Sequence, residues 1–274
     1  MPFTLSHAAY AVPLARPLGR LSGRRVPVST LVIGSWVPDI AYMLPVALPR
    51  SSHTLDGLLW FCLPMGWLCY LLWHHVIRAA LCDLMPMASL RARLARFARP
   101  GLPTASFRAV SVGLLVGAVS HLLLDGFTHR EQFFVQLMPF LQLEVLRAGS
   151  YHLPLYNLLQ HVLGIVGLAW LGRMGLQALG REASGFMPAS RLTHVQRRSL
   201  WLAFALGVLA VMVGPLVQAV LAHGGAIEEW LATGAFRAMS LCGIGLLAYG
   251  LVWQRLGLVR PAGRHDGLRA NTHS

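Results

Sequence analysis

The chain has 274 residues, of which 55% are hydrophobic and only 12% are charged. A water-soluble domain carries roughly 25% charged residues, so this composition argues against a soluble protein and favours a helical bundle in a lipid bilayer. The net charge is +13 and every basic residue is an arginine, but the arginines lie between apolar segments, which indicates loops beside an anionic membrane and excludes a nucleic-acid partner.

Six apolar segments follow one another along the chain. The first, at 29–48, contains Pro38, Asp39 and Pro45. Proline removes a helix donor and clashes with the preceding turn. Five further segments supply the roughly 20 apolar residues that a spanning helix needs, and they are 57–77, 108–127, 154–172, 199–222 and 237–256. The predicted fold is all-α, an integral membrane bundle of five to six transmembrane helices whose first segment is broken at Pro38-Asp39.

The arginines indicate how the bundle is oriented. Three segments carry 6, 5 and 4 arginines, namely 78–108, 173–198 and 255–274, whereas the alternating loops 48–56, 129–151 and 223–235 carry 1, 2 and 0. Arginine-rich loops stay in the cytoplasm. We therefore expect a multi-pass inner-membrane protein with its arginine-rich loops and C-terminus in the cytoplasm. We predict one membrane-embedded domain at 1–260 and a disordered cytoplasmic tail at 261–274.

Candidate metal ligands close the segment 108–127. It ends in His121-Leu-Leu-Leu-Asp125-Gly-Phe-Thr-His129, and residues four apart lie on one helix face. Imidazole nitrogens and carboxylate oxygens suit Zn²⁺, Fe²⁺ or Mn²⁺. Because an ionisable residue within a spanning helix is costly, Asp125 favours a functional site over a structural one.

Two upstream residues extend this set. Asp39 lies at the expected break of the first segment, and a break frees backbone groups that must line a cavity or bond to protein. His53 lies in the short loop before 57–77, which the arginine pattern places on the same outer face as Asp125 and His129. Each of these side chains could instead bond across helices without any chemical role.

His7 is the candidate nearest the N-terminus. It follows Thr4-Leu-Ser6, a stretch that could cap a helix. The arginines at 16–25 favour an N-terminus at the inner face. His7 therefore reaches the outer face only if the first 15 residues dip back into the bilayer, or if the first apolar segment is not a simple span.

The motifs together resemble a known family. MPFTLSHAAYAVPL, the Pro38-Asp39 pair, the His53 segment, GAVSHLLLDGFTH and LYNLLQHVLG resemble the bacterial membrane proteins grouped as domain of unknown function 4184, over most of the chain. The arrangement is also similar to predicted membrane-bound metal-dependent hydrolases and, more distantly, to zinc-dependent phospholipase C. This resemblance implies metal ligands at His7, Asp39, His53, His121, Asp125 and His129. The phospholipase pattern continues with a late His-x-x-x-Glu, where this chain has His161 and Ile165, so one or two ions are expected in place of three.

The expected function is a membrane-bound metal-dependent hydrolase that acts on a phosphoester or an ester, with a lipid or lipid-linked substrate. One or two divalent ions, zinc first among them, would activate a water, and Asp125 or Asp39 would be the general base. Two alternatives stay open. A proton- or cation-coupled transporter could use a broken helix with a buried aspartate, and a non-catalytic scaffold could use the polar residues only to hold its helices together.

Overall fold

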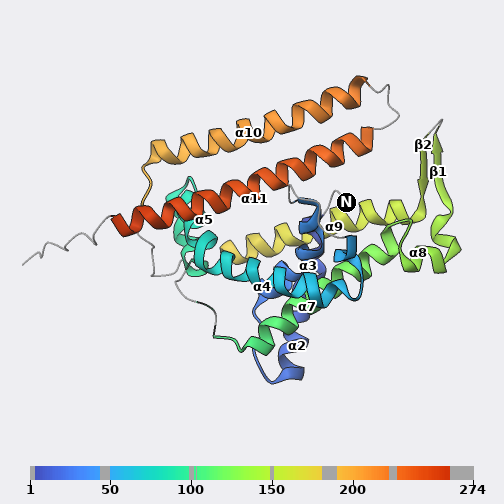
Figure 1. Cartoon of the computed structure of the whole chain (residues 1–274), viewed down its shortest axis with the longest axis horizontal. Helices are drawn as coiled ribbons and strands as arrows, with labels where there is room; N and C mark the ends of the chain where they lie inside the picture. Colours follow the sequence, from blue (N-terminus) through green and yellow to red (C-terminus); the bar gives the residue numbers. More distant parts are fainter. Residues whose placement is uncertain are drawn as a thin grey trace, which may run out of the picture.

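The computed structural model describes residues 4–43, 50–98, 102, 104–148, 151–180, 190–221 and 227–259. Its long helices lie alongside one another, and a hairpin projects at one end (Figure 1). Within the described ranges the only sheet is this antiparallel hairpin of β1 (Glu144–Ala148) and β2 (Tyr151–Pro154). The all-α prediction is confirmed. The predicted tail at 261–274 lies outside the described residues.

The N-terminal part of the chain is a helical hairpin. Four short helices run through residues 4–22 and are followed by one longer helix: η1 (Thr4–Ser6), α1 (His7–Ala11), η2 (Val12–Leu14), α2 (Ala15–Ser22) and α3 (Val28–Met43). Gly23 follows α2 with φ of 63°, a left-handed conformation that glycine adopts without the steric cost of a Cβ. The chain reverses there, so α3 returns along the helices that precede it.

The remaining helices complete the bundle. In chain order they are η3 (Arg50–His53), η4 (Leu58–Cys62), α4 (Leu63–Leu72), η5 (Trp73–Ile77), α5 (Arg78–Leu84), α6 (Ala88–Leu94), η6 (Ala95–Phe97), α7 (Phe107–Thr128), α8 (Phe133–Leu137), η7 (Pro139–Gln142), α9 (Leu155–Gly180), α10 (His194–Leu221) and α11 (Ile227–Val259). The predicted span 57–77 is helical throughout, but π-helical turns at η4 and η5 flank α4.

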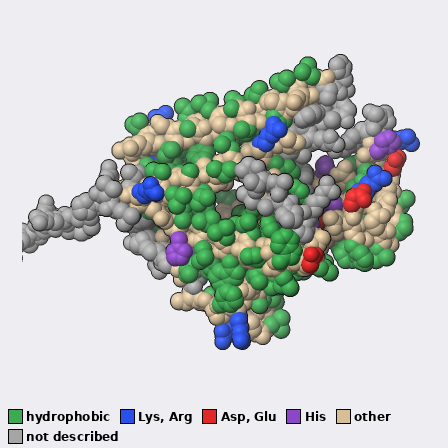
Figure 2. All heavy atoms as spheres, viewed as in Figure 1, with side chains coloured by type: hydrophobic (Ala, Val, Ile, Leu, Met, Phe, Trp, Pro, Cys, Tyr) green, Lys and Arg blue, Asp and Glu red, His purple; other side chains and the backbone are tan. Residues whose placement is uncertain are grey.

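Four helices are long and apolar enough to cross a membrane: Phe107–Leu137, Leu155–Gly180, His194–Gln218 and Thr233–Arg255. They coincide with four of the predicted spans. Many large apolar side chains of α9, α10 and α11 point outward, and hydrophobic side chains cover much of the face shown in Figure 2, with few charges among them. Such a surface is stable in lipid and unfavourable in water, which identifies a membrane protein.

The predicted break at Pro38-Asp39 is wrong, because α3 continues through both residues to Met43. Proline leaves the carbonyl one turn earlier without its usual donor and disturbs the preceding turn. The neighbouring helix α7 contacts the same turn: the carbonyl of Ser35, one residue after the carbonyl that loses its donor, accepts a hydrogen bond from Nδ1 of His121 at 2.7 Å. Prolines are tolerated in membrane helices that pack closely against neighbouring helices.

Close packing of α3 against α7 makes that contact possible. A Cβ added at Gly34 would overlap the carbonyl of Leu114, and one at Gly117 would lie 2.5 Å from the carbonyl of Leu31. Small residues let helix backbones approach closely in membranes. Beside this contact lies a core cluster that includes Val37 and Leu114.

The directions of the helices bring both ends of the N-terminal hairpin close to the C-terminal end of α7, where His121 and Asp125 lie. Thr30 lies against Gly113 and Ser35 against His121, so α3 and α7 run in parallel. Because α1 and α2 run opposite to α3, His7 and Asp39 arrive at the same end. The first residues thus reach back into the bundle, where the ring of His7 stacks on that of His121.

Candidate metal centre

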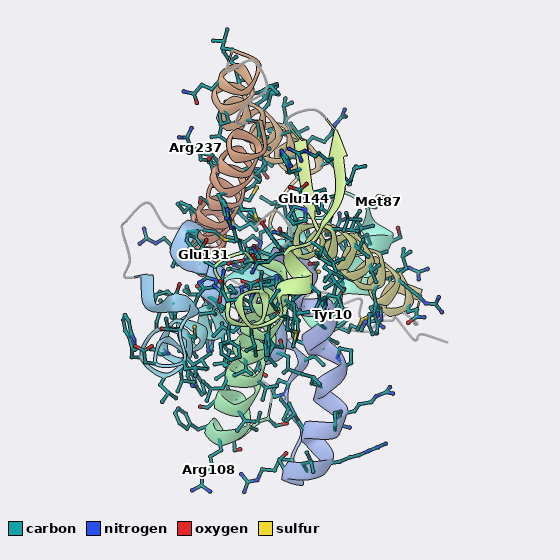
Figure 3. The ribbon with its side chains drawn as sticks, turned by 90° about the vertical axis from the view of Figure 1, so that its right-hand side faces the viewer. Tyr10, Met87, Arg108, Glu131, Glu144 and Arg237 are labelled. Atoms are coloured by element: carbon teal, nitrogen blue, oxygen red, sulfur yellow. The ribbon has the colours of Figure 1, made fainter. Side chains whose placement is uncertain are left out.

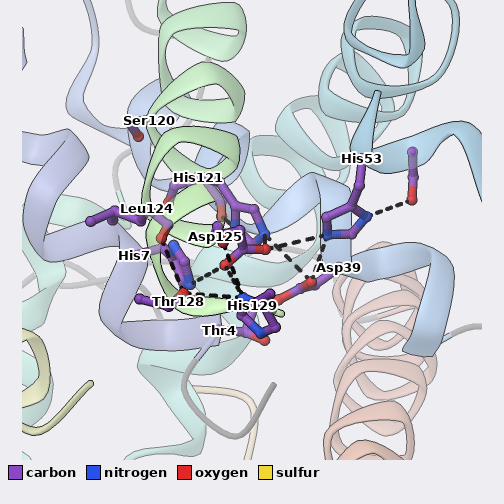
Figure 4. A network of polar contacts seen from close by, with 12 residues as sticks. Thr4, His7, Asp39, His53, Ser120, His121, Leu124, Asp125, Thr128 and His129 are labelled. Atoms are coloured by element: carbon purple, nitrogen blue, oxygen red, sulfur yellow. Dashed lines mark hydrogen bonds and ion pairs between the residues drawn. The ribbon is translucent and has the colours of Figure 1, made fainter. Parts of the chain in front are cut away.

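Four predicted ligands from three elements point toward a common centre (Figure 4). They are Asp39 of α3, His53 of η3, and His121 and Asp125 of α7. One donor atom from each lies within 4.8 Å of the other three. The i, i+4 spacing on α7 supplies two of these donors, and the fold supplies the others from residues 68 or more positions earlier in the chain.

The spacing of these atoms matches a metal site. Nε2 of His53 lies 3.2 Å from Oδ1 of Asp39 and 3.7 Å from Oδ2 of Asp125. Nε2 of His121 lies 3.5 Å and 3.1 Å from the same two oxygens. Bonds of about 2.0–2.1 Å to a tetrahedral ion place its donors about 3.3–3.4 Å apart, which is the middle of this range.

The other nitrogen of each imidazole bonds to protein. Nδ1 of His121 donates to the Ser35 carbonyl, because a carbonyl can only accept. Nδ1 of His53 lies 3.0 Å from the hydroxyl of Ser52. For His121, the proton on Nδ1 leaves the lone pair of Nε2 directed at the centre, as in histidines that bind metals. Nε2 of His53 forms a hydrogen bond with Oδ1 of Asp39, a contact that a bound ion would replace.

The two carboxylates are buried with no arginine beside them. Asp39 is 0% exposed and Asp125 is 2% exposed, and in the described part of the chain no arginine forms an ion pair with either. Oδ2 of Asp39 accepts a 2.5 Å hydrogen bond from Thr4. Burying unpaired charge is strongly unfavourable, so a cation at the centre would compensate both carboxylates.

A proton shared between His121 and Asp125 explains this geometry less well. Nε2 of His121 lies 3.1 Å from Oδ2 of Asp125, yet this buried nitrogen has no hydrogen bond in the described structure. The two atoms are close without the alignment that a hydrogen bond needs. Donor atoms that surround one ion adopt this arrangement, because each points at the ion and not at its neighbour.

The last two predicted ligands lie on the other side of Asp125. Nε2 of His7 is 3.6 Å from Oδ1 of Asp125, and its ring stacks on that of His121 with centroids 4.0 Å apart. Nδ1 of His129 is 3.5 Å from the same oxygen. The fold thus gathers all six predicted residues, four around one point and two beside it.

Several supporting groups escaped the sequence analysis. Thr4, predicted to help cap a helix, donates to Asp39 instead, and Ser6 at the start of α1 makes no side-chain capping bond. The amide of Gln160 lies 3.2 Å from Nε2 of His129. Neither contact has a local sequence signal, since each joins residues at least 31 positions apart.

A pocket opens over the centre. Its volume is about 340 Å³, and it is lined by Tyr42, His53, Asp125, His129, Arg130, Glu131, Gln132 and Phe236. Two rings, those of Tyr42 and Phe236, lie 6.0 Å apart. Figure 3 shows Glu131 beyond one end of α7 and Arg108 at the other, so the pocket belongs to the end opposite the arginine-lined start of this helix.

The fold and this centre define a helical membrane protein with a buried histidine and aspartate cluster that could hold a metal ion. The chain belongs to the family described as Domain of unknown function (DUF4184), whose model matches residues 1–253. Neither the curated proteins nor the solved structures contain a match to it.

Proposed function

We propose that this protein is a membrane-bound metal-dependent hydrolase whose divalent ion is held by Asp39, His53, His121 and Asp125. The observation that carries the proposal is the convergence of these four donors on one point. Two of them are buried carboxylates that form no ion pair with an arginine among the described residues. The resemblance of the same residues to those of membrane-bound metal-dependent hydrolases supports it.

The donor set favours a metal of intermediate softness. Two imidazole nitrogens and two carboxylate oxygens suit Zn²⁺, Mn²⁺ or Fe²⁺, and the described cluster has no thiolate. Such an ion lowers the pKa of a bound water so that hydroxide is available near neutral pH. A water would need a coordination position beyond the four protein donors, and the pocket that His53 and Asp125 help to line lies beside them.

Of the two predicted general bases, Asp125 keeps an oxygen available and Asp39 does not. Asp39 directs Oδ1 to the centre and uses Oδ2 to accept from Thr4. Oδ1 of Asp125 is buried and has no hydrogen bond in the described structure. This oxygen is therefore the one that could take a proton from water or bind a further cation.

The pocket suits an anionic ester with an apolar portion. Arg130 supplies a guanidinium, which pairs well with phosphate or carboxylate oxygens. Tyr42 of α3 and Phe236 of α11 supply aromatic walls that an acyl chain or prenyl group can contact. We therefore propose a phosphoester or ester on a lipid or lipid-linked substrate.

The arginines at the start of α7 lie away from this pocket. Arg24 and Arg108 line one cavity at the start of α7, whereas the pocket lies beyond its other end. If the positive-inside rule orients the bundle, the centre faces the outer side of the inner membrane. The substrate would then come from the outer leaflet.

The transporter hypothesis depended on a broken first helix. Transporters expose half-helix ends and unwound carbonyls to their ions, but α3 continues through Pro38 and Asp39. The scaffold hypothesis requires that the polar groups satisfy one another, whereas Nε2 of His121 and Oδ1 of Asp125 have no hydrogen bonds in the described structure. These observations weaken the two alternatives and favour a bound metal ion, which the hydrolase requires.

Elemental analysis joined to an activity screen tests the proposal. The detergent-purified protein should carry a transition metal and should hydrolyse members of a panel of fluorogenic phosphoesters and acyl esters. His121→Ala and Asp125→Asn should lose both metal and hydrolysis. His152→Ala is the control, because its ring pairs with Glu144 on the exposed hairpin. Metal content equal in all four proteins would refute the proposal.

A further inference from the structure

A cavity lined by arginines lies where α2 meets the start of α7 (Figure 1). Its volume is about 660 Å³, and the arginines that line it are Arg16, Arg20, Arg24 and Arg25. No acidic residue is among its described lining, and none of the four arginines forms an ion pair with another described residue. Four guanidinium groups around one cavity repel one another, so an anion held between them would be stabilised by all four.

The turn after α2 makes these arginines converge. The first two are four positions apart and therefore lie on one face of α2. Gly23 reverses the chain with its left-handed backbone. The loop that follows returns along the helix, since a Cβ added at Gly19 would lie 3.4 Å from the carbonyl of Arg24. The second pair of arginines thus comes to lie beside the first pair.

A smaller cavity adjoins the first and extends along α7. Its volume is about 210 Å³, it shares Arg24 and Val26 with the larger cavity, and it adds Arg108 and Val112. Val112 is 41% exposed, and Phe107 at the first position of α7 is 70% exposed. Because α7 is long and apolar enough to cross a membrane, these apolar side chains can contact acyl chains directly beside the arginines.

This combination of side chains suits a phospholipid. Guanidinium groups form paired, charge-assisted hydrogen bonds with phosphate oxygens, and basic pockets beside membrane helices bind the headgroups of anionic lipids. A soluble phosphate would use only the arginines, whereas a phospholipid would also place an acyl chain along Phe107 and Val112. The exposed apolar side chains therefore favour a lipid over a soluble anion.

We propose that the arginine cavity binds the phosphate headgroup of an anionic phospholipid whose acyl chain lies along the start of α7. The site is separate from the candidate metal centre, because Arg108 and Glu131 lie toward opposite ends of α7 (Figure 3). The general attraction of arginines to an anionic membrane surface requires no cavity. The specific prediction is that these arginines, and not others near the helix ends, select the lipid.

Calorimetric titration tests this site. The full-length protein in an uncharged detergent is titrated with dioctanoyl phosphatidylglycerol, with dioctanoyl phosphatidylcholine and with glycerol phosphate. Wild type should bind the anionic lipid more tightly than the other two ligands. The double variant Arg20→Gln with Arg24→Gln should bind it about 30-fold more weakly, because each arginine near an anionic lipid contributes roughly a factor of five.

A matched control removes two arginines elsewhere. Arg173 of α9 and Arg198 of α10 are exposed and line neither cavity. The double variant Arg173→Gln with Arg198→Gln carries the same net charge as the cavity variant and should bind the lipid as wild type does. Both double variants should keep the melting temperature and metal content of wild type when no lipid is added.

The outcomes decide both the site and its occupant. A 30-fold loss confined to the cavity variant supports the proposal. Equal losses in the two double variants would show attraction by net charge alone and overturn the site, as would wild-type affinity in the cavity variant. Glycerol phosphate binding as tightly as the anionic lipid would overturn the lipid as the occupant. None of these results bears on the metal-dependent hydrolase, whose ligands the variants leave unchanged.

Discussion

At the scale of single residues, the polar motif of α7 was predictable and its supporting contacts were not. His121 and Asp125 are four positions apart on one helix, so local geometry alone places them together. The Ser35 carbonyl and the Thr4 hydroxyl reach the cluster across 86 and 35 positions. Such contacts depend on how helices pack, which no local pattern in the sequence encodes.

The Thr4 hydroxyl gives a prediction at this scale. Thr4→Val removes the hydrogen bond to Oδ2 of Asp39 and leaves a buried carboxylate oxygen unsatisfied. Losing a group that orients a metal ligand typically weakens metal affinity about 10–100-fold. Competition with a chelating dye should show this loss, while Thr4→Ser, which keeps the hydroxyl, should bind metal almost as wild type does. Equal affinities for Val and Ser would show that the contact does not orient Asp39.

At the scale of helices, apolar length predicted α7, α9, α10 and α11 because lipid requires long uninterrupted apolar segments. The same reasoning failed for α3. The rule that proline ends a helix considers one helix in isolation, whereas His121 on α7 supplies a donor to the disturbed turn around Ser35. Packing between helices therefore overrode local propensity at the residue pair that carries the site.

The contact between α3 and α7 should be sensitive to a single methyl group. Gly117→Ala places a Cβ 2.5 Å from the Leu31 carbonyl, so the helices must separate. Overpacking of this kind costs about 1–3 kcal/mol, and the shift should also disrupt the hydrogen bond between Ser35 and His121. We expect a lower melting temperature together with reduced metal content.

A glycine in open surroundings supplies the control for that experiment. Gly172 of α9 has no atom within 4 Å of the added Cβ. Gly172→Ala should leave metal content unchanged and melting temperature equal or higher, since alanine favours helix over glycine by about 0.5–1 kcal/mol. If Gly117→Ala behaves in the same way, close approach of α3 and α7 does not hold the site together.

At the scale of the whole molecule, a buried ion pair fastens the α10–α11 hairpin to the rest of the bundle. Oδ1 of Asp83 on α5 accepts from Arg197 of α10 at 2.6 Å, and Oδ2 accepts from Trp253 of α11 at 2.8 Å. Both side chains of the ion pair are nearly inaccessible. From the sequence, Arg197 is predicted only to lie in a cytoplasmic loop, because positive charge near a helix end has that general explanation.

Removing one member of this pair should destabilise the fold without emptying the metal centre. Asp83→Asn leaves the Arg197 guanidinium buried without its counter-charge, which costs about 3–5 kcal/mol in comparable buried pairs. We expect a clear fall in melting temperature and unchanged metal content per folded chain. Loss of metal in proportion to stability would contradict the separation of these two regions.

Asp83 should also make the stability of the fold depend on pH in the acid range. Burial opposes ionisation of Asp83, but hydrogen bonds from Trp253, the Arg191 backbone and Arg197 outweigh it and hold its pKa below the usual value. A carboxyl whose pKa is depressed by folding stabilises the protein above its unfolded pKa, about 3.9, and this contribution is lost as pH falls below that value. Melting curves recorded downward from pH 5 should therefore drop more steeply for wild type than for Asp83→Asn.

We propose that imidazoles and carboxylates from α3, η3 and α7 bind a metal ion together. X-ray absorption at the edge of the metal that copurifies with the protein measures this directly. We expect a shell of only nitrogen and oxygen at about 2.0–2.1 Å, with scattering from at least two imidazoles, and loss of that signal in Asp125→Asn. Sulfur in the first shell, or a spectrum unchanged by Asp125→Asn, would contradict it.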